Sequence, residues 1–109
     1  MNRLTTAATL GVLLALAGCG KTMSSLDVAI MREEVRTDPE AKQAHMRACI
    51  QSFSKRGLAE RTDLAQTAGT SLANMPRVVC NRLVRALANG RMKSDEFNGR
   101  KSVAPIIRK

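Results

Sequence analysis

The segment before Cys19 constrains the fold most strongly, because its pattern predicts that it is cleaved from the mature chain. The chain opens with one basic side chain, Arg3, and carries no charge from residue 7 to residue 17. This uncharged stretch is too short for a membrane-spanning helix, which needs roughly 20 apolar residues. A basic start, a short apolar core and small residues before a cleavage point are typical of a secretory signal peptide. The sequence therefore predicts cleavage after residue 18, which leaves residues 19–109 for one small domain.

The residues at the predicted cleavage point are Leu16-Ala17-Gly18-Cys19. They resemble the lipobox of bacterial lipoproteins at all four positions. The resemblance implies that the Cys19 thiol receives a diacylglycerol and becomes the lipidated N-terminus. Stable anchoring takes more than one acyl chain, each contributing about 0.8 kcal/mol per buried CH₂. Since Gly20 follows rather than aspartate, the resemblance favours the outer membrane over the inner membrane. An ordinary secretory signal with an unrelated cysteine is the alternative.

The positive charge is unevenly distributed along the chain. The formal net charge is +9, yet residues 19–41 hold more acidic than basic groups. Residues 42–109 are strongly basic and favour anionic partners: acidic lipids, lipopolysaccharide phosphates, wall polymers or acidic proteins. The alternative is that the charge only confers solubility. Nucleic acid is not an expected partner, because Phe53 and Phe97 are the only aromatic residues and single strands are usually bound by aromatic stacking.

Start and stop signals predict two helices in the middle of the chain. Asp38-Pro39-Glu40 combines an N-cap, a proline at the first helical position and an acidic first turn. Gly57 is a natural terminator for the helix that follows. A second helix is expected from Thr62-Asp63 to Met75, although Gly69 weakens it by roughly 1 kcal/mol relative to alanine.

A third helix is expected from Pro76 to about Ala88, where Asn89-Gly90 closes it. Ser94 is a suitable cap for a last short helix. No part of the chain shows the alternating pattern of a β-strand. The sequence therefore predicts an all-α fold, a unit of three or four helices over residues 38–104.

The two flanks are expected to lie outside this unit. Residues 19–37 would form the lipidated N-terminus and a tether, with a short helix over residues 26–36 that either docks or remains mobile near the membrane. The apolar residues of that helix make only an incomplete stripe: Leu26, Ile30 and Met31. At the other end Pro105 cannot continue a helix, so residues 105–109 are expected to be a loosely held tail.

Two cysteines remain once Cys19 is assigned to lipid by its resemblance. Cys49 and Cys80 each lie on the apolar face of a predicted helix, and the exported chain matures in a compartment that can be oxidising. These observations together predict a disulfide that staples the helical unit. The loop-entropy estimate gives such a bond about 3–4 kcal/mol of stability.

His45 lies one helical turn before Cys49 and raises the question of a metal site. His45, Cys49 and Cys80 would supply three ligands, but a fourth is not evident and the paired-cysteine spacings of zinc sites are absent. His45 is therefore expected to be a partly exposed surface residue. Catalysis by Cys49 with His45 lacks an orienting acid, and a disulfide would remove the thiolate. We therefore expect no metal, no cofactor and no enzymatic activity.

The third predicted helix carries the candidate binding residues. Arg77, Arg82 and Arg85 lie on the arc opposite its apolar face, and we expect them to bind an anionic partner. The expected function is that of a small envelope lipoprotein with a basic helical binding or accessory module.

A short motif follows this helix: Gly90, Met92, Glu96-Phe97 and Lys101. Over about residues 83–101 it resembles the C-terminal helical modules of many bacterial membrane-associated proteins, although Lys93 stands where a small hydroxyl residue is usual. The resemblance implies association, so the alternative function is an assembly subunit of an envelope complex, joined through Met92 and Phe97. A simple helix–glycine–helix corner with Phe97 in the core explains the same residues.

Overall fold

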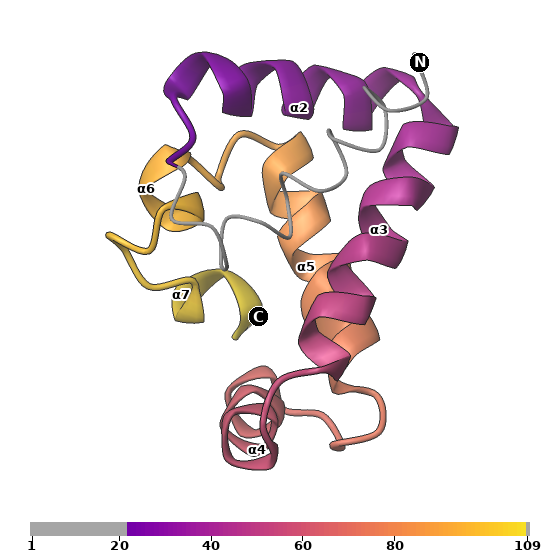
Figure 1. Ribbon diagram of the computed structural model, residues 1–109, viewed down its shortest axis with the longest axis vertical. Coiled ribbons are helices and arrows are strands. Elements are labelled where there is room, and N and C mark those ends of the chain that lie inside the picture. Colours follow the sequence, from indigo (N-terminus) through magenta and orange to yellow (C-terminus); the bar gives the residue numbers. More distant parts are fainter. Residues whose placement is uncertain (1–21, 109) are drawn as a thin grey trace.

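The computed structural model describes residues 22–108, and over that range the fold is all-α (Figure 1). The expected fold class is confirmed, and no β-strand occurs among these residues. None of the helices in this range has the length and hydropathy to cross a membrane. In chain order the helices are α2 (Ser25–Thr37), α3 (Pro39–Ser54), α4 (Leu58–Ala68), α5 (Met75–Ala88), α6 (Ser94–Phe97) and α7 (Ala104–Ile107).

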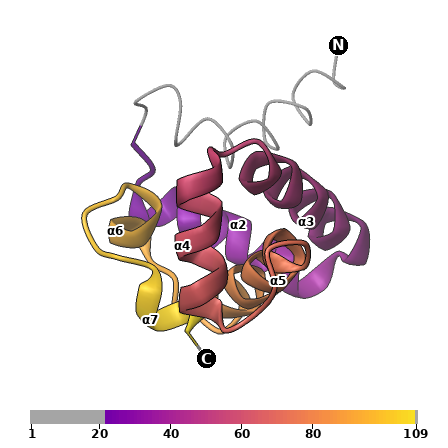
Figure 2. The same cartoon turned by 90° about the horizontal axis from the view of Figure 1, so that it is seen from below.

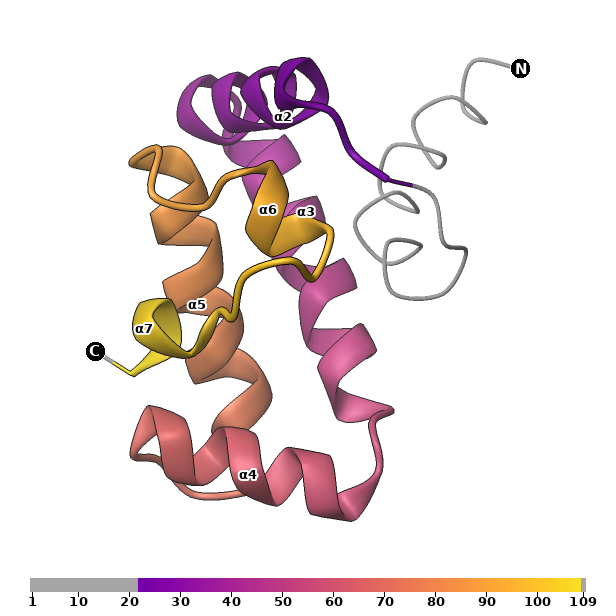
Figure 3. The same cartoon turned by 90° about the vertical axis from the view of Figure 1, so that its left-hand side faces the viewer.

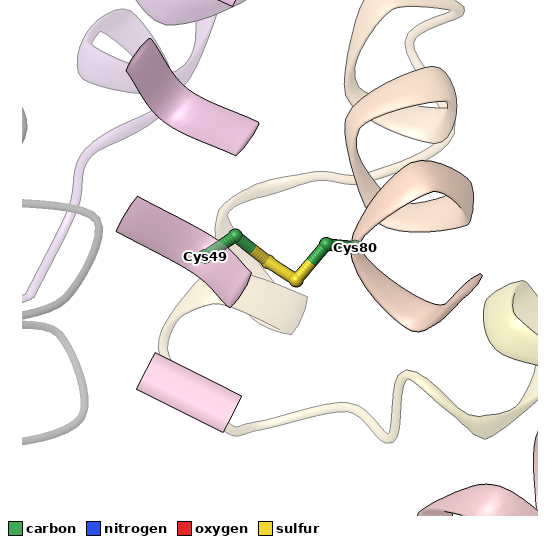
Figure 4. Close-up of a disulfide and its surroundings, with 2 residues drawn as sticks. All are labelled: Cys49 and Cys80. Atoms are coloured by element: carbon green, nitrogen blue, oxygen red, sulfur yellow. A yellow bond between two sulfur atoms is a disulfide. The ribbon is translucent and has the colours of Figure 1, made fainter. Parts of the chain in front are cut away.

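Helices α3 and α5 form the centre of the domain, and the predicted disulfide joins them (Figure 4). The α carbons of Cys49 and Cys80 are 5.9 Å apart, and both side chains are buried. Helix α3 begins as its sequence predicts, because the Asp38 Oδ1 accepts hydrogen bonds from the backbone N–H groups of Glu40 and Ala41. The disulfide thus lies where α3 packs against α5, and the other helices pack around these two.

Helix α2 packs across one end of α3 and α5 and belongs to the domain, not to a tether (Figures 1 and 3). Its buried side chains are Val28, Met31 and Val35. Leu26 and Ile30, which the sequence pattern grouped with Met31, are 68% and 52% exposed. The expected stripe was therefore wrong, because contact with α3 and α5 selects the face that carries the valines.

Helix α4 begins and ends earlier than its sequence pattern predicts. It starts at Leu58, directly after Gly57, and ends at Gly69, which adopts a left-handed conformation with φ +71°. The Thr70 N–H donates to the Ala65 carbonyl 3.0 Å away and completes this terminal turn. Gly69 therefore ends the helix instead of weakening its middle, as glycine commonly does at this position.

The expectation of a loosely held C-terminal tail was wrong. Residues Ala104–Ile107 form α7, with Pro105 in its first turn. Ile106 is buried and Ile107 is only 1% exposed, because α7 packs against α5 and α4. Proline prevents the continuation of an existing helix but is well suited to open a new one.

The segment between α5 and α7 forms a corner that returns to the core. Gly90 has φ +80°, and the Glu96 carboxylate accepts a hydrogen bond from the Lys93 N–H at the start of α6. Lys93, not Ser94, is the N-cap residue. Met92 and Phe97 are 7% and 8% exposed, so these two side chains belong to the core.

Candidate functional site

The solvent-facing side of α5 carries a positive surface that we call the α5 basic face, made of Arg77, Asn81 and Arg85. The three residues are exposed and follow one another at intervals of four, so they lie along one side of the helix. The chain contains no aspartate or glutamate from residue 64 to residue 94. Within the described chain neither arginine forms an ion pair; Arg77 donates only to the Asn74 side-chain oxygen, at 3.1 Å. Both guanidinium groups are therefore able to bind an anion.

Arg82, the third predicted binding residue, has a structural position instead. Its side chain is half-buried, and its Nη1 donates to the backbone carbonyls of Ala68 and Ile107. These bonds connect the end of α4 and the end of α7 to α5. Because its Nη1 donates to two backbone carbonyls, Arg82 is not included in the α5 basic face.

Several other basic side chains are neutralised by neighbouring carboxylates. Ion pairs join Arg36 to Glu33, Arg56 to Glu60 and Arg100 to Asp95. Exposed pairs of this kind contribute little stability, but they reduce the local positive potential. The α5 basic face differs because no carboxylate lies beside it on its own helix.

A groove of about 480 Å³ opens among α3, α4, α5 and the segment from α6 to Val103. Its size falls in the range of roughly 300–1,000 Å³ that is usual for small-molecule sites. The rim carries Arg56, Glu60, Glu96 and Lys101, whose formal charges balance. The walls are mainly apolar and include Phe53, Leu64, Leu87, Met92, Phe97 and Val103.

Asn98 fixes the N-terminal end of the described chain at this groove. Its Oδ1 accepts a hydrogen bond from the Met23 N–H at 2.7 Å, and its Nδ2 donates to the Met23 carbonyl at 3.0 Å. Asn98 also lines the groove, and the Met23 side chain is buried. Sequence reasoning missed Asn98, because its partner is 75 residues away and no local pattern marks it.

His45 is buried, with 1% of its surface exposed, so the expectation of a surface histidine was wrong. Its Nε2 lies 3.5 Å from the Glu34 carboxylate on α2, the helix whose packing covers it. Its Nδ1 faces no hydrogen-bond partner among the described residues, and the ring lines the groove. Cys49 is oxidised in the disulfide, so neither a Cys–His ligand pair nor a thiolate nucleophile exists in this state.

Cys19, the predicted lipidation residue, lies outside the described residues, and its modification stays a prediction. The chain matches no protein-family model, no curated protein and no solved structure.

Proposed function

We propose that this protein is a lipid-anchored envelope lipoprotein whose helical domain binds an anionic partner through the α5 basic face. The observation that carries the proposal is the pair Arg77 and Arg85, both exposed and both without a carboxylate partner in the described chain. A guanidinium group forms strong, often bidentate hydrogen bonds with carboxylate and phosphate oxygens. The proposed activity is binding and not catalysis.

The position of α5 favours a partner that lies away from the anchoring membrane. Figures 2 and 3 show α5 on the side of the domain away from the indigo segment that leads into α2. An anchor at Cys19 would hold this segment near the bilayer, because only a few residues separate Cys19 from Met23. The α5 side of the domain would then face the periplasm, where carboxylate-bearing wall polymers and acidic proteins are the accessible partners.

Charge reversal tests the proposal. The unlipidated mature chain should bind isolated cell-wall sacculi at low ionic strength, and Arg77→Glu with Arg85→Glu should weaken that binding at least tenfold. Arg36→Glu with Arg47→Glu is the matched control, because it makes the same charge change on other exposed surfaces. Binding of the wild type should also fall as salt is added. Equal binding by the wild type and both double variants would rule the α5 basic face out.

A second candidate function, the assembly subunit, needs a different surface from the one predicted. Met92 and Phe97 are in the core, whereas Leu26 and Ile30 on α2 are one helical turn apart and more than half exposed. These two side chains form the apolar surface that would support association. Leu26→Glu with Ile30→Glu should abolish any oligomer that cross-linking of the wild type detects.

A further inference from the structure

The groove presents mainly apolar walls near the N-terminal end of the described chain, where Asn98 binds Met23. Residues from α3, α4, α5 and α6 contribute to its walls, so it is a feature of the assembled fold and not of one loop. Apolar walls that face water are unfavourable, and an apolar ligand that displaces this water gains free energy roughly in proportion to the area it covers. The interior therefore suits a hydrocarbon chain better than a polar metabolite.

The charges at the rim argue against a ligand that needs a counter-ion. Arg56 is paired with Glu60, and Glu96 is bound to the Lys93 N–H, which leaves Lys101 as the rim cation without an ion pair in the described chain. The rim carries equal numbers of acidic and basic side chains. A neutral ester-linked acyl chain fits this rim better than a lipid with a multiply charged headgroup.

The two hydrogen bonds between Asn98 and Met23 bring the predicted lipidation residue, Cys19, close to the groove. Asn98 lines the groove and holds the Met23 backbone by these bonds, although Met23 itself is not a lining residue. Cys19 precedes Met23 by four residues, and a fully extended chain of that length spans at most about 14 Å. An acyl chain attached to Cys19 would therefore begin close to the groove.

We propose that this groove binds one acyl chain of the protein's own lipidated Cys19 when the protein is away from a bilayer. The proposal rests on the lipidation that forms part of the proposed function. Inside a bilayer the chain gains as much from the lipid as from the groove, so the groove is occupied only during transfer through water. Binding one chain would reduce the acyl surface that the lipoprotein exposes to water in that state.

The test compares two forms of the full mature chain in detergent-free buffer. One form carries lipid on Cys19, verified by mass spectrometry, and the other is the unlipidated Cys19→Ser chain. The probe is the methyl ester of dansyl-undecanoic acid, a neutral chain whose fluorescence increases on entering an apolar site. The unlipidated form should bind one equivalent, and the lipidated form should bind it at least tenfold more weakly because its own acyl chain occupies the groove.

A matched pair of variants localises the probe. Ser52 lines the groove, whereas its neighbour Gln51 is exposed and does not. In the unlipidated chain Ser52→Phe should weaken probe binding at least tenfold, and Gln51→Phe should leave it unchanged. Val103→Phe fills the groove from another wall and should repeat the loss if Ser52→Phe proves poorly folded by circular dichroism.

Two results would overturn the proposal. Absence of saturable binding to the unlipidated chain would show that the groove takes no acyl chain. Equal binding to the lipidated and unlipidated forms would show that Cys19 does not supply the occupant, and that the groove binds a free acyl chain. Both results leave the α5 basic face untouched, since sacculus binding is measured on the unlipidated chain. Absence of lipid on Cys19 would instead contradict the anchoring part of the proposed function, and the own-chain occupant with it.

Discussion

The Asn98 side chain satisfies both backbone polar groups of Met23, as donor to the carbonyl and as acceptor from the N–H. This pairing resembles one rung of a β-ladder, made by a side-chain amide in place of a second strand. It holds the residue that precedes the N-cap of α2 against the end of α6, and the two residues are 75 positions apart in the sequence. A single side-chain amide therefore binds the Met23 backbone at the N-terminal end of the described chain.

Asn98→Ala should remove both hydrogen bonds to the Met23 backbone. Each lost hydrogen bond costs about 0.5–1.5 kcal/mol, so urea unfolding should show a loss of about 1–3 kcal/mol. Hydrogen exchange at Met23 and Ser24 should accelerate more than exchange in α3. Asn98→Asp keeps the acceptor but places a carboxylate oxygen against the Met23 carbonyl oxygen, so it should not recover the stability of the wild type. An unchanged exchange rate at Met23 in Asn98→Ala would show that Asn98 does not protect the Met23 N–H.

Arg82→Ala should destabilise the domain, because the carbonyls of Ala68 and Ile107 lose a charged donor. Hydrogen bonds from charged groups contribute about 1.5–3 kcal/mol, and the expected loss in thermal or urea unfolding is of that order. Arg82→Lys should recover only part of it, since an ammonium group lacks the planar arrangement of donors. Arg85→Ala, on the exposed side of the same helix, should change stability by less than about 0.5 kcal/mol. Similar losses for Arg82→Ala and Arg85→Ala would argue against the structural assignment.

Opening the disulfide should lower stability strongly. The bond joins residues 31 apart, for which loop entropy predicts about 3–4 kcal/mol. The paired variant Cys49→Ala with Cys80→Ala should show this loss in denaturant unfolding, and Cys19→Ala should not. Thiol labelling of the unreduced protein in denaturant should find neither Cys49 nor Cys80 reactive. Labelling of either cysteine under those conditions would mean that the bond is not formed in the protein as isolated.

His45→Leu should be tolerated despite the complete burial of this residue. The Nδ1 atom is buried without a partner among the described residues, and the contact from Nε2 to Glu34 is long, at 3.5 Å. Replacing a poorly satisfied polar group by an apolar one of similar size is often close to neutral. The free energy of unfolding should therefore change by less than about 1 kcal/mol, whereas Val79→Ala, in the same core, should cost more. A loss above that of Val79→Ala would show that the imidazole makes an essential polar contact.

Gly69→Ala should destabilise the end of α4. The glycine has φ +71°, a conformation that costs other residues roughly 1–2 kcal/mol, although the added methyl group would meet no atom within 4 Å. Gly57→Ser is the contrasting variant: it places a capping side chain at the N-cap of α4, where none is present, and should gain a few tenths of a kcal/mol. Both changes are measurable by thermal unfolding. A neutral Gly69→Ala would contradict the left-handed helix end.

The features that sequence analysis predicted correctly are those decided within a few residues. The Asp38-Pro39 start of α3 and the Asn89-Gly90 end of α5 depend on local backbone hydrogen bonds. The cysteine pair was predictable because each cysteine lies on the apolar face of its own helix. These signals act within a few residues, so packing by distant segments does not change them.

The features that were missed depend on contacts between distant segments. Arg82 has the position of a surface arginine on its own helix, and only its hydrogen bonds to the ends of α4 and α7 give it a structural role. His45 becomes buried because α2 packs over it, and Asn98 has no marker at all. The same reason explains why the apolar stripe of Leu26, Ile30 and Met31 is not the face that α2 buries: periodicity identifies apolar residues but not the face that a neighbour covers.

Under the proposed export of this chain, the burial of Ile106 and Ile107 has a consequence for the order of folding events. A chain that crosses a membrane with its N-terminus first delivers α3 and α5 before α7, so Cys49 and Cys80 can meet before the last helix arrives. Arg82 and the core under α7 stay uncovered during that interval. Oxidation would therefore capture an incomplete domain, which becomes fully packed only when the final helix has been translocated.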